Sequence, residues 1–316
     1  MINITLKQLR YFEALARHGH FGHAADACAI SQPALSMQIK ELETALGAPL
    51  VERNARRLRL TRLGEDMLGR TRDILRSVDE LGELARVSRG QLVGRLRLGV
   101  IPTVAPYLLP GLIGQLGTTH SGIDLHVRET LTQRLIEELH EGRIDAAIVA
   151  LPVSEPAFAE MPLFSESFVL VRPEGEAGKP VPDKSELREM RLLLLEEGHC
   201  FRDQALSFCK IQSALPRDGL DANSLSTLVQ MVGAGIGVTL VPEMALDVET
   251  RSAAVSVARF PPPEPARTIG LIWRKSSPLA AQLIQVAESL KTAMRKGADQ
   301  AGNGPAKPAD PAEGRQ

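Results

Sequence analysis

Hydrophobic positions near the N-terminus recur at helical spacing and are interrupted by turn signals. Leu6 to Phe12 opens one amphipathic helix, and a later helix carries an apolar stripe made of Leu35, Ile39, Leu42 and Leu46. Between them, Ala24 and Ala25 are small enough for two helices to cross closely. Ser31 is a good N-cap, and Pro33 suits the first turn of a new helix. The pattern predicts a helix-turn-helix whose last helix leaves Gln32, Ser36, Gln38 and Lys40 available for a DNA major groove. On the pattern alone, a helix that is only solvated on this face fits equally well.

The following segment is strongly basic. Ten residues without an acid contain Arg53, Arg56, Arg57, Arg59 and Arg62. Leu58 and Leu60 alternate with these arginines as in a short hairpin strand. A charge run is usually only a solvated surface. Beside a recognition helix, however, it is better interpreted as a wing that contacts phosphates and the minor groove, because both contacts depend on positive potential.

Residues 63–89 are predicted to form one long helix without proline. Apolar positions recur in it at three- or four-residue spacing, at Met67, Thr71, Ile74, Val78, Leu81 and Ala85. The stripe could pack on its own domain, but near-heptad spacing favours a partner helix from a second chain. Pairing of this kind would place two recognition helices on the half-sites of a pseudo-palindromic operator.

From Gly94 onward, strands and helices alternate. Strands are expected at 96–100, 123–128 and 146–149, and helices at 107–116 and 132–140. This alternation predicts an α/β domain with a parallel sheet. A chain of 316 residues with 44% apolar content is long enough for two or three domains.

Two of the three cysteines lie in one short segment, Gly198 to Cys209. Cys200 stands between His199 and Arg202, and cationic neighbours favour the thiolate that reacts with oxidants. Beyond Asp203, a possible N-cap, the apolar residues fall at helical spacing and turn Cys209 toward an interior. Nine helical steps span roughly 13 Å at about 1.5 Å per residue, whereas a disulfide needs Cα atoms within about 7 Å. The pair is therefore either a redox switch that requires local unfolding or two unrelated core cysteines.

Charge and hydropathy agree with a DNA-binding protein of the cytoplasm. Residues 1–90 carry 14 Lys and Arg against 11 Asp and Glu, while the whole chain has a net charge of −1. No signal peptide is evident, and the apolar runs near 98–116 and 228–246 are broken by Pro and Gly, so we expect no membrane span. In a reducing compartment a disulfide would be transient and regulatory.

Three other motifs are weaker. Gly233, Gly235 and Gly237 follow a helix instead of opening one, which favours helix termination over a phosphate loop.

A metal site is not expected near Cys28. The histidines there, His18, His20 and His23, have no second cysteine beside them. A cysteine hydrolase or thiol peroxidase would leave the N-terminal ninety residues unexplained, so we do not expect an enzyme, and no cofactor is implied.

The motifs together resemble one family. The string GHCFRDQALSFC is similar to the redox segment of the peroxide-responsive, OxyR-type branch of the LysR-type transcriptional regulators, and residues 5–65 resemble the DNA-binding domain of that family. Three further strings resemble landmarks of its effector domain: GRLRLG at 94–99, GRIDAAI at 142–148 and AGIGVTLVP at 234–242.

The resemblance implies a winged helix-turn-helix over residues 1–62, a dimerisation helix over 63–90, an effector domain over 91–296 and a disordered tail over 297–316. The effector domain is expected to resemble periplasmic binding proteins. Its lobe I would comprise 91–165 and 268–296, and its lobe II 166–267. The crossings between the lobes are expected near Phe164 to Val169 and near Arg267 to Ile272.

Residue roles carried over from the family divide into two groups. The DNA-binding group is Ser31, Gln32, Pro33, Ser36, Gln38, Lys40, Arg53, Arg56 and Arg57. In the redox group, Cys200 is expected to be the peroxidatic thiol and Cys209 the resolving thiol, which would join in a reversible disulfide. Thr103 and Thr132 would orient peroxide, although Thr130 could replace Thr132 and Thr103 could simply cap a helix near Pro106. Support for the Cys200 thiolate is expected from His199, Arg202 and Asp203.

Partners follow from the same resemblance. It implies double-stranded operator DNA, a homodimer or homotetramer, RNA polymerase, hydrogen peroxide as the signal, and a thiol reductant of the glutaredoxin or thioredoxin type. The function would be transcriptional control of oxidative-stress genes. The alternative is a LysR-type regulator that responds to a small metabolite bound between the effector lobes.

Overall fold

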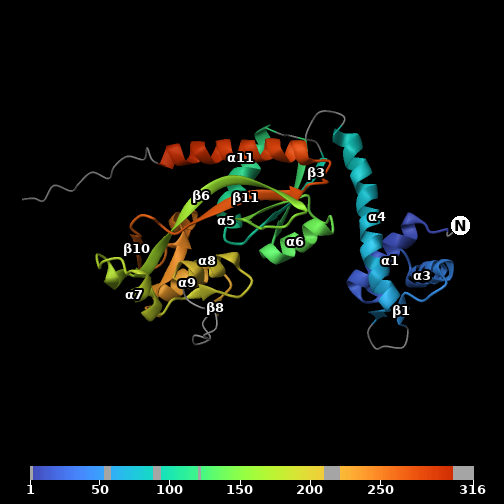
Figure 1. Ribbon diagram of the computed structural model, residues 1–316, viewed down its shortest axis with the longest axis horizontal. Helices are drawn as coiled ribbons and strands as arrows, with labels where there is room; N and C mark the ends of the chain where they lie inside the picture. The colour runs from blue at the N-terminus through green and yellow to red at the C-terminus, as the bar shows by residue number, and fades with distance from the viewer. Residues whose placement is uncertain (1–2, 53–57, 88–93, 120–121, 210–220, 302–316) are drawn as a thin grey trace, which may run out of the picture. The chain divides into compact units, whose positions relative to one another are not determined.

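The structure is a computed structural model that describes residues 3–52, 58–87, 94–119, 122–209 and 221–301. Contacts within the chain divide it into two compact units, Met1–Gly90 and Gln91–Gln316 (Figure 1). Each unit has a hydrophobic core of its own, so each is considered separately.

The first unit is a winged helix-turn-helix. It contains α1 (Leu6–His18), α2 (Phe21–Ala27), α3 (Gln32–Leu46), β1 (Val51–Glu52), β2 (Arg59–Leu60) and α4 (Arg62–Val87). Local signals set its boundaries, because Thr5 and Gln8 form a capping box and Ser31 caps α3. The strands β1 and β2 pair antiparallel, as predicted for the wing. The predicted helices and hairpin are confirmed.

Helix α4 leaves much of its apolar stripe open to solvent in the single chain. Thr71 is fully buried, but Ile74 and Leu81 are 46% and 65% exposed. Leu84 is 53% exposed. A 26-residue helix with such a stripe is the kind of surface that a second helix covers.

The second unit begins with lobe I, which contains β3 (Gly94–Val100), α5 (Ala105–Thr119), β4 (Ile123–Glu129), α6 (Thr132–His140), β5 (Ala146–Leu151) and, at its C-terminal end, α11 (Ala280–Ala301). Helix α6 has the predicted bounds. Strands β3, β4 and β5 are parallel, as predicted, but their sheet is mixed in its remaining strands. Its order is β10-β6-β11-β5-β3-β4, with β9 paired to β6.

Two long strands explain the mixed sheet. β6 (Phe158–Pro173) and β11 (Ala266–Arg274) are antiparallel to each other, and both pass from one lobe to the other. The predicted crossings fall on these strands. The parallel arrangement predicted for three strands is confirmed, and the sheet is mixed because the lobes are also joined by continuous antiparallel strands and not only by βαβ connections. Helices α11 and α6 lie on opposite sides of the strands (Figure 1).

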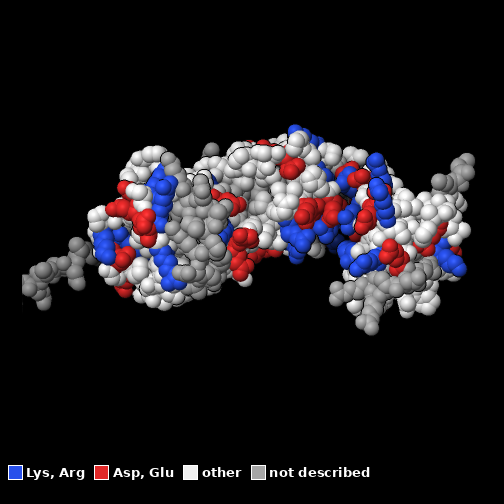
Figure 2. Space-filling model, turned by 60° about the horizontal axis from the view of Figure 1, so that its bottom comes forward, with Lys and Arg blue, Asp and Glu red and all other residues white. Residues whose placement is uncertain are grey.

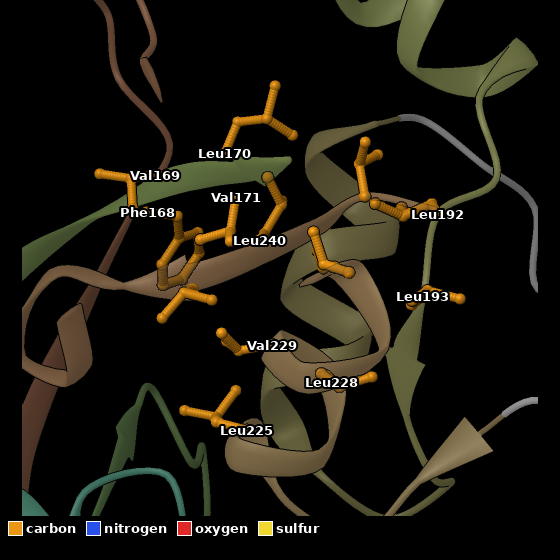
Figure 3. Close-up of a cluster of buried hydrophobic side chains, with 14 of the residues drawn as sticks. Phe168, Val169, Leu170, Val171, Leu192, Leu193, Leu225, Leu228, Val229 and Leu240 are labelled. Atoms are coloured by element: carbon orange, nitrogen blue, oxygen red, sulfur yellow. The ribbon is translucent and has the colours of Figure 1, made fainter. Parts of the chain in front are cut away.

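Lobe II consists of short elements around one apolar core. They are α7 (Lys184–Glu189), β7 (Leu194–Leu195), α8 (Cys200–Phe208), β8 (Asp221–Ala222), α9 (Leu225–Gly233), β9 (Thr239–Pro242), α10 (Leu246–Glu249) and β10 (Val255–Arg259), with 3-10 turns at Glu174–Glu176 and Glu243–Ala245. Figure 3 shows side chains of β6, including Phe168 and Val171, facing those of α9, including Leu228 and Val229. Gly235, with φ of +76°, follows α9 and supports the helix-termination interpretation.

The C-terminal helix corrects one predicted boundary. α11 extends to Ala301, so Gly297 lies inside a helix and not at the start of a tail. The residues after Gly297 are mostly helix formers, which lets the helix continue past a single glycine. Residues 302–316 lie outside the described part.

Acidic and basic side chains are intermingled on the face seen in Figure 2. Ion pairs such as Arg95–Asp124 and Arg134–Glu137 join opposite charges on lobe I. Among the described helices, none is long and apolar enough to cross a membrane.

Candidate redox and DNA-binding sites

The two cysteines of the redox segment lie at opposite ends of helix α8. Cys200 is its first residue, and Cys209 directly follows its last. The predicted helix is therefore confirmed, but its start was wrong: His199, and not Asp203, occupies the N-cap position. Asp203 lies in the first turn, where a carboxylate is favourable to the helix dipole, so its position is explained without capping.

The turn before α8 brings its N-terminal end against lobe I. Gly198 has φ of +94°, and a Cβ at this position would come within 3.0 Å of Leu131 Cδ1. The gap at this contact is too small to hold a water molecule; it is lined by Ile101, Pro102, Thr103, Leu131, Thr132, Gly198, His199 and Cys200. The fold thus gathers most of the predicted redox group at one place between the lobes.

A larger pocket adjoins the other side of Cys200. Its volume is about 600 Å³. The lining residues are Thr132, Ile136, Ala150, Leu151, Pro152, Val153, Ser165, Cys200, Asp203, Gln204, Ala266, Arg267 and Thr268. Cys200 is half-buried and lines this pocket, so a small molecule that entered it would meet this residue.

Thr103 is held by a residue that sequence reasoning did not assign to the site. Nη1 of Arg267 donates to Thr103 Oγ1 at 2.8 Å, and Nη2 donates to the Thr103 carbonyl oxygen at 3.0 Å. Nε of Arg267 donates to Glu166 Oε1 at 2.8 Å, and all three residues are buried. The Thr103 hydroxyl therefore accepts from a charged donor, which leaves its own hydrogen for another acceptor. An arginine next to the apolar run of strand β11 was the signal that could have pointed to Arg267.

The hydroxyl of Thr132, unlike that of Thr103, accepts no hydrogen bond from a neighbouring side chain in the described part of the chain. Its Oγ1 is buried and has no hydrogen-bond partner among the described residues, although it borders both the gap and the pocket. Thr130 lines neither the gap nor the pocket; its backbone N–H donates to the Val100 carbonyl. A buried hydroxyl without a partner is costly, and a polar ligand would satisfy it. The geometry favours Thr132 over Thr130 as the second threonine.

The two predicted cationic neighbours of Cys200 differ. Burial lowers the pKa of His199 below its ordinary value, against a smaller raising effect from the Glu196 carboxylate. Its imidazole is therefore favoured in the neutral form, which can exchange a proton but adds no fixed positive charge. Arg202, on the first turn of α8, donates from Nη1 to the Leu195 carbonyl at 2.8 Å.

The C-terminal end of α8 has an apolar setting. Cys209 is 0% exposed, and burial raises the pKa of its thiol, partly offset by Lys184 and Arg188. Phe201 is 2% exposed and meets Phe168 edge-on, with ring centroids 5.0 Å apart. The Arg267 guanidinium lies 5.6 Å from the Phe201 ring centroid, so the network around Thr103 also contacts the redox helix.

The predicted DNA-contacting residues lie on or beside α3. Ser31 Oγ accepts from the Ala34 backbone N–H, and Gln38 Nε2 donates to Glu41 Oε2 at 2.8 Å. Gln32, Pro33 and Lys40 are exposed, while Ser36 is half-buried. The wing residues Arg53, Arg56 and Arg57 lie outside the described part.

The third cysteine belongs to the core of the first unit. Cys28 packs against its apolar cluster, and burial raises the pKa of its thiol. His20 Nδ1 accepts from the Gly22 backbone N–H and so caps α2. Within the described ranges, no group of three or more His, Cys, Asp or Glu is arranged to hold a metal ion.

A winged helix-turn-helix followed by a two-lobed domain with a cysteine at its lobe junction defines the class of signal-responsive bacterial transcription regulators. Comparisons with known families agree. Residues 6–65 match the bacterial regulatory helix-turn-helix protein, lysR family, and residues 89–295 match the LysR substrate binding domain.

Individual relatives show to which members of the LysR family this chain is similar. A "Probable hydrogen peroxide-inducible genes activator" of Streptomyces viridosporus is 44% identical over 92% of this chain and 95% of its own length. The "DNA-binding transcriptional dual regulator OxyR" of Escherichia coli K12 is 40% identical over 92% of this chain and 96% of its own. The chain therefore belongs to the LysR family, and within it to the OxyR-type hydrogen peroxide-inducible gene activators.

Solved structures agree with this membership. Full-length OxyR of Pseudomonas aeruginosa, in a cysteine-to-aspartate variant, superposes with a TM-score of 0.73 at 36% identity, covering 92% of this chain and 95% of the other. OxyR of Corynebacterium glutamicum, in a cysteine-to-serine variant with hydrogen peroxide bound, gives 0.65 at 35% identity, covering 95% of both chains.

Proposed function

We propose that this protein is a sequence-specific DNA-binding regulator that senses hydrogen peroxide through Cys200 and a reversible Cys200–Cys209 disulfide, and that it controls oxidative-stress genes. The observation that carries the proposal is the position of Cys200: a half-buried thiol at the lobe junction, beside a threonine hydroxyl that has no hydrogen-bond partner in the described chain. Family membership supports the same chemistry.

The reaction has two steps. The Cys200 thiolate attacks one peroxide oxygen, an S–O bond forms as the O–O bond breaks, and the second oxygen leaves as water after taking a proton. Cys200 is then a sulfenic acid. The Cys209 thiolate attacks its sulfur, the S–S bond forms, and the hydroxyl leaves as a second water. A thiol reductant of the glutaredoxin or thioredoxin type returns two electrons and restores both thiols.

Each polar group at the junction has a role in this scheme. Thr103 and Thr132 would orient peroxide, with the Thr132 hydroxyl free to bind it and the Thr103 hydroxyl fixed by Arg267. Neutral His199 would accept the proton of the Cys200 thiol. Arg202 and Asp203, in the first turn of α8, would add to the field around the thiolate.

The signal would reach DNA through a change of shape. Each α4 would pair with that of a second chain, and a homodimer or homotetramer would bind a pseudo-palindromic operator and contact RNA polymerase. Closing the disulfide unwinds α8, which offers the effector domain two discrete packings that can reorient the subunits. We place the protein in the cytoplasm, acting as a regulator and not through enzymatic turnover.

The alternative function is supported by the larger pocket. Its volume of about 600 Å³ lies within the range of metabolite sites, so a regulator that binds a small metabolite could use it. One measurement separates the two functions. After one equivalent of peroxide, intact mass should fall by two hydrogens for the sensor and remain unchanged for the metabolite binder. Footprinting of an operator with reduced and oxidised protein should then show a change in protected length.

A separate experiment addresses the DNA-binding surface. Gln32→Ala or Ser36→Ala should mainly relax sequence preference, whereas Arg53→Ala or Arg57→Ala should weaken binding to every duplex and lower the salt slope by about one ion per lost contact. Binding titrations on specific and unrelated duplexes at several salt concentrations measure both effects. Unchanged binding in all four variants would contradict the assignment.

A further inference from the structure

Two cations of helix α7 contact the last residue of α8, Phe208, and its C-cap, Cys209. Nε of Arg188 donates to the Cys209 carbonyl oxygen at 2.9 Å, and Nζ of Lys184 lies 4.7 Å from the centroid of the Phe208 ring. Lys184 and Arg188 are one helical turn apart, so they share one face of α7. The sequence showed neither contact, because α7 precedes α8 by an intervening strand.

This position is well suited to stabilise the reduced helix. The last carbonyls of a helix have no partner within the helix, and the helix dipole places partial negative charge there. A guanidinium that donates to the C-cap carbonyl gives this oxygen a hydrogen-bond partner. Its positive charge also interacts favourably with the negative end of the helix dipole. The Lys184 ammonium adds a cation–π contact on the neighbouring ring.

Helix α7 has contacts of its own that hold it in lobe II. Asp183 caps it, with a full capping box to Glu186, and Leu187 is completely buried in the core of lobe II, which also contains Phe201 and Cys209. The capped helix presents both cations to the end of α8.

The opposite end of α8 is anchored differently. Phe201 is buried against Phe168 and the Arg267 guanidinium. The C-terminal end is packed as well, with Cys209 fully buried and Phe208 against Phe260. A disulfide would bring the cysteines from roughly 13 Å to within about 7 Å, so the backbone around Cys209 could not keep its place at the end of an intact helix. That displacement breaks the contact between Arg188 and the Cys209 carbonyl.

We propose that Lys184 and Arg188 form a clamp: they stabilise the C-terminal end of α8 in the dithiol form. By doing so they raise the reduction potential of the Cys200–Cys209 pair. The clamp residues are positioning residues, since they touch neither peroxide nor the reacting sulfurs. The inference rests on the proposed Cys200–Cys209 disulfide. Stabilising the dithiol makes the disulfide more oxidising, so loss of the clamp should make the reduction potential more negative.

The test is a redox titration of the full-length protein in glutathione buffers of fixed ratio, with alkylation and mass measurement of the Cys200 and Cys209 peptides. Arg188→Ala should shift the equilibrium about tenfold toward the disulfide, the effect of one charge-assisted hydrogen bond, which corresponds to about 30 mV. Lys184→Gln should shift it about twofold in the same direction. Arg188→Lys keeps a charged donor and should recover most of the wild-type value.

Arg251→Ala is the matched control, because Arg251 is an exposed arginine of the same lobe on a different element, just after α10. It should leave the equilibrium unchanged. If wild-type protein forms no Cys200–Cys209 disulfide with peroxide, the proposed function fails. If the disulfide forms but Arg188→Ala has the same redox equilibrium as wild type, the proposed clamp is wrong and the proposed function stands.

A second measurement separates a clamp from a general structural role. Trp273, the single tryptophan of the chain, lies in β11 and reports on unfolding of the effector unit. Arg188→Ala should lower the urea midpoint of the reduced protein and leave that of the oxidised protein unchanged. An equal loss in both forms would mean that the contact survives oxidation, and it would overturn the proposal.

Discussion

The two ends of α8 place the same chemical group in opposite surroundings. Cys200 is half-buried at the lobe junction among polar groups, whereas Cys209 is completely buried, with a pKa raised by burial. They stand at the two ends of one nine-residue helix, with Cys200 its first residue and Cys209 directly after its last. In the proposed function the environments assign the roles: the half-buried Cys200 would meet the oxidant first, and the buried Cys209 would react once the helix opens.

The difference also shows why the response is a conformational change. An exposed pair of thiols within bonding distance would oxidise without moving the fold. Here the proposed bond would require the helix to unwind, so each oxidised molecule would also be a rearranged one.

The largest effect should come from removing either thiol. Cys200→Ser should abolish the peroxide response while DNA binding persists, because the nucleophile is lost and the first unit is untouched. Cys209→Ser should still be oxidised at Cys200 but stop at sulfenic acid, which a dimedone adduct detects by mass. Hydrogen exchange across α8 should change on oxidation far more in wild type than in Cys209→Ser.

Cys28→Ser serves as the control for both variants, since Cys28 packs in the core of the first unit. Its response should match that of wild type. Loss of the peroxide response in Cys28→Ser would show that Cys200 has been wrongly assigned as the sensing thiol. Equal hydrogen-exchange protection of α8 in the dithiol and disulfide forms would exclude unwinding.

The next effect separates the two threonines. Thr103→Val removes the acceptor of a buried Arg267 donor, and an unsatisfied buried group costs about 1–3 kcal/mol. Urea unfolding should therefore show a clear loss of stability. A stability equal to wild type would mean that Arg267 finds another partner.

Thr132→Val is the counterpart of that variant. The Thr132 hydroxyl has no protein partner in the described chain, so its loss should leave stability unchanged or slightly improved. The rate of Cys200 oxidation should nevertheless fall about tenfold, since one hydrogen bond to peroxide in the transition state is worth about 1.4 kcal/mol. Stopped-flow oxidation kinetics measure this. A normal rate would remove Thr132 from the peroxide site.

The smallest effect concerns pH. Burial lowers the pKa of His199 in the folded protein, so the unfolded chain binds this proton more readily. The stability that neutral His199 contributes is present above its unfolded pKa of about 6.5 and is lost as pH falls below it. His199→Gln should flatten the fall in urea midpoint between neutral pH and pH 5. Identical slopes in wild type and variant would contradict the lowered pKa.

Local signals determined much of this protein from sequence alone. Ser31, Pro33 and the stripe of Leu35, Ile39 and Leu42 predicted α3, because capping and helical periodicity act over a few residues. The same holds for α6 and for the helix that separates the two cysteines. Residue types near Cys200 suggested its proposed chemistry, but the charge expected of His199 was not local, because burial in the folded chain lowers its pKa.

Tertiary structure alone decided what depends on distant segments. The strand directions of β6 and β11, the choice of Thr132 over Thr130 as a lining residue, and the pairing of Arg267 with Thr103 were not evident beforehand. Arg267 and Thr103 are 164 positions apart, and Arg188 reaches Cys209 across 21. Contacts of this kind form only when distant segments pack together in the folded chain. The local sequence around either residue does not indicate its partner.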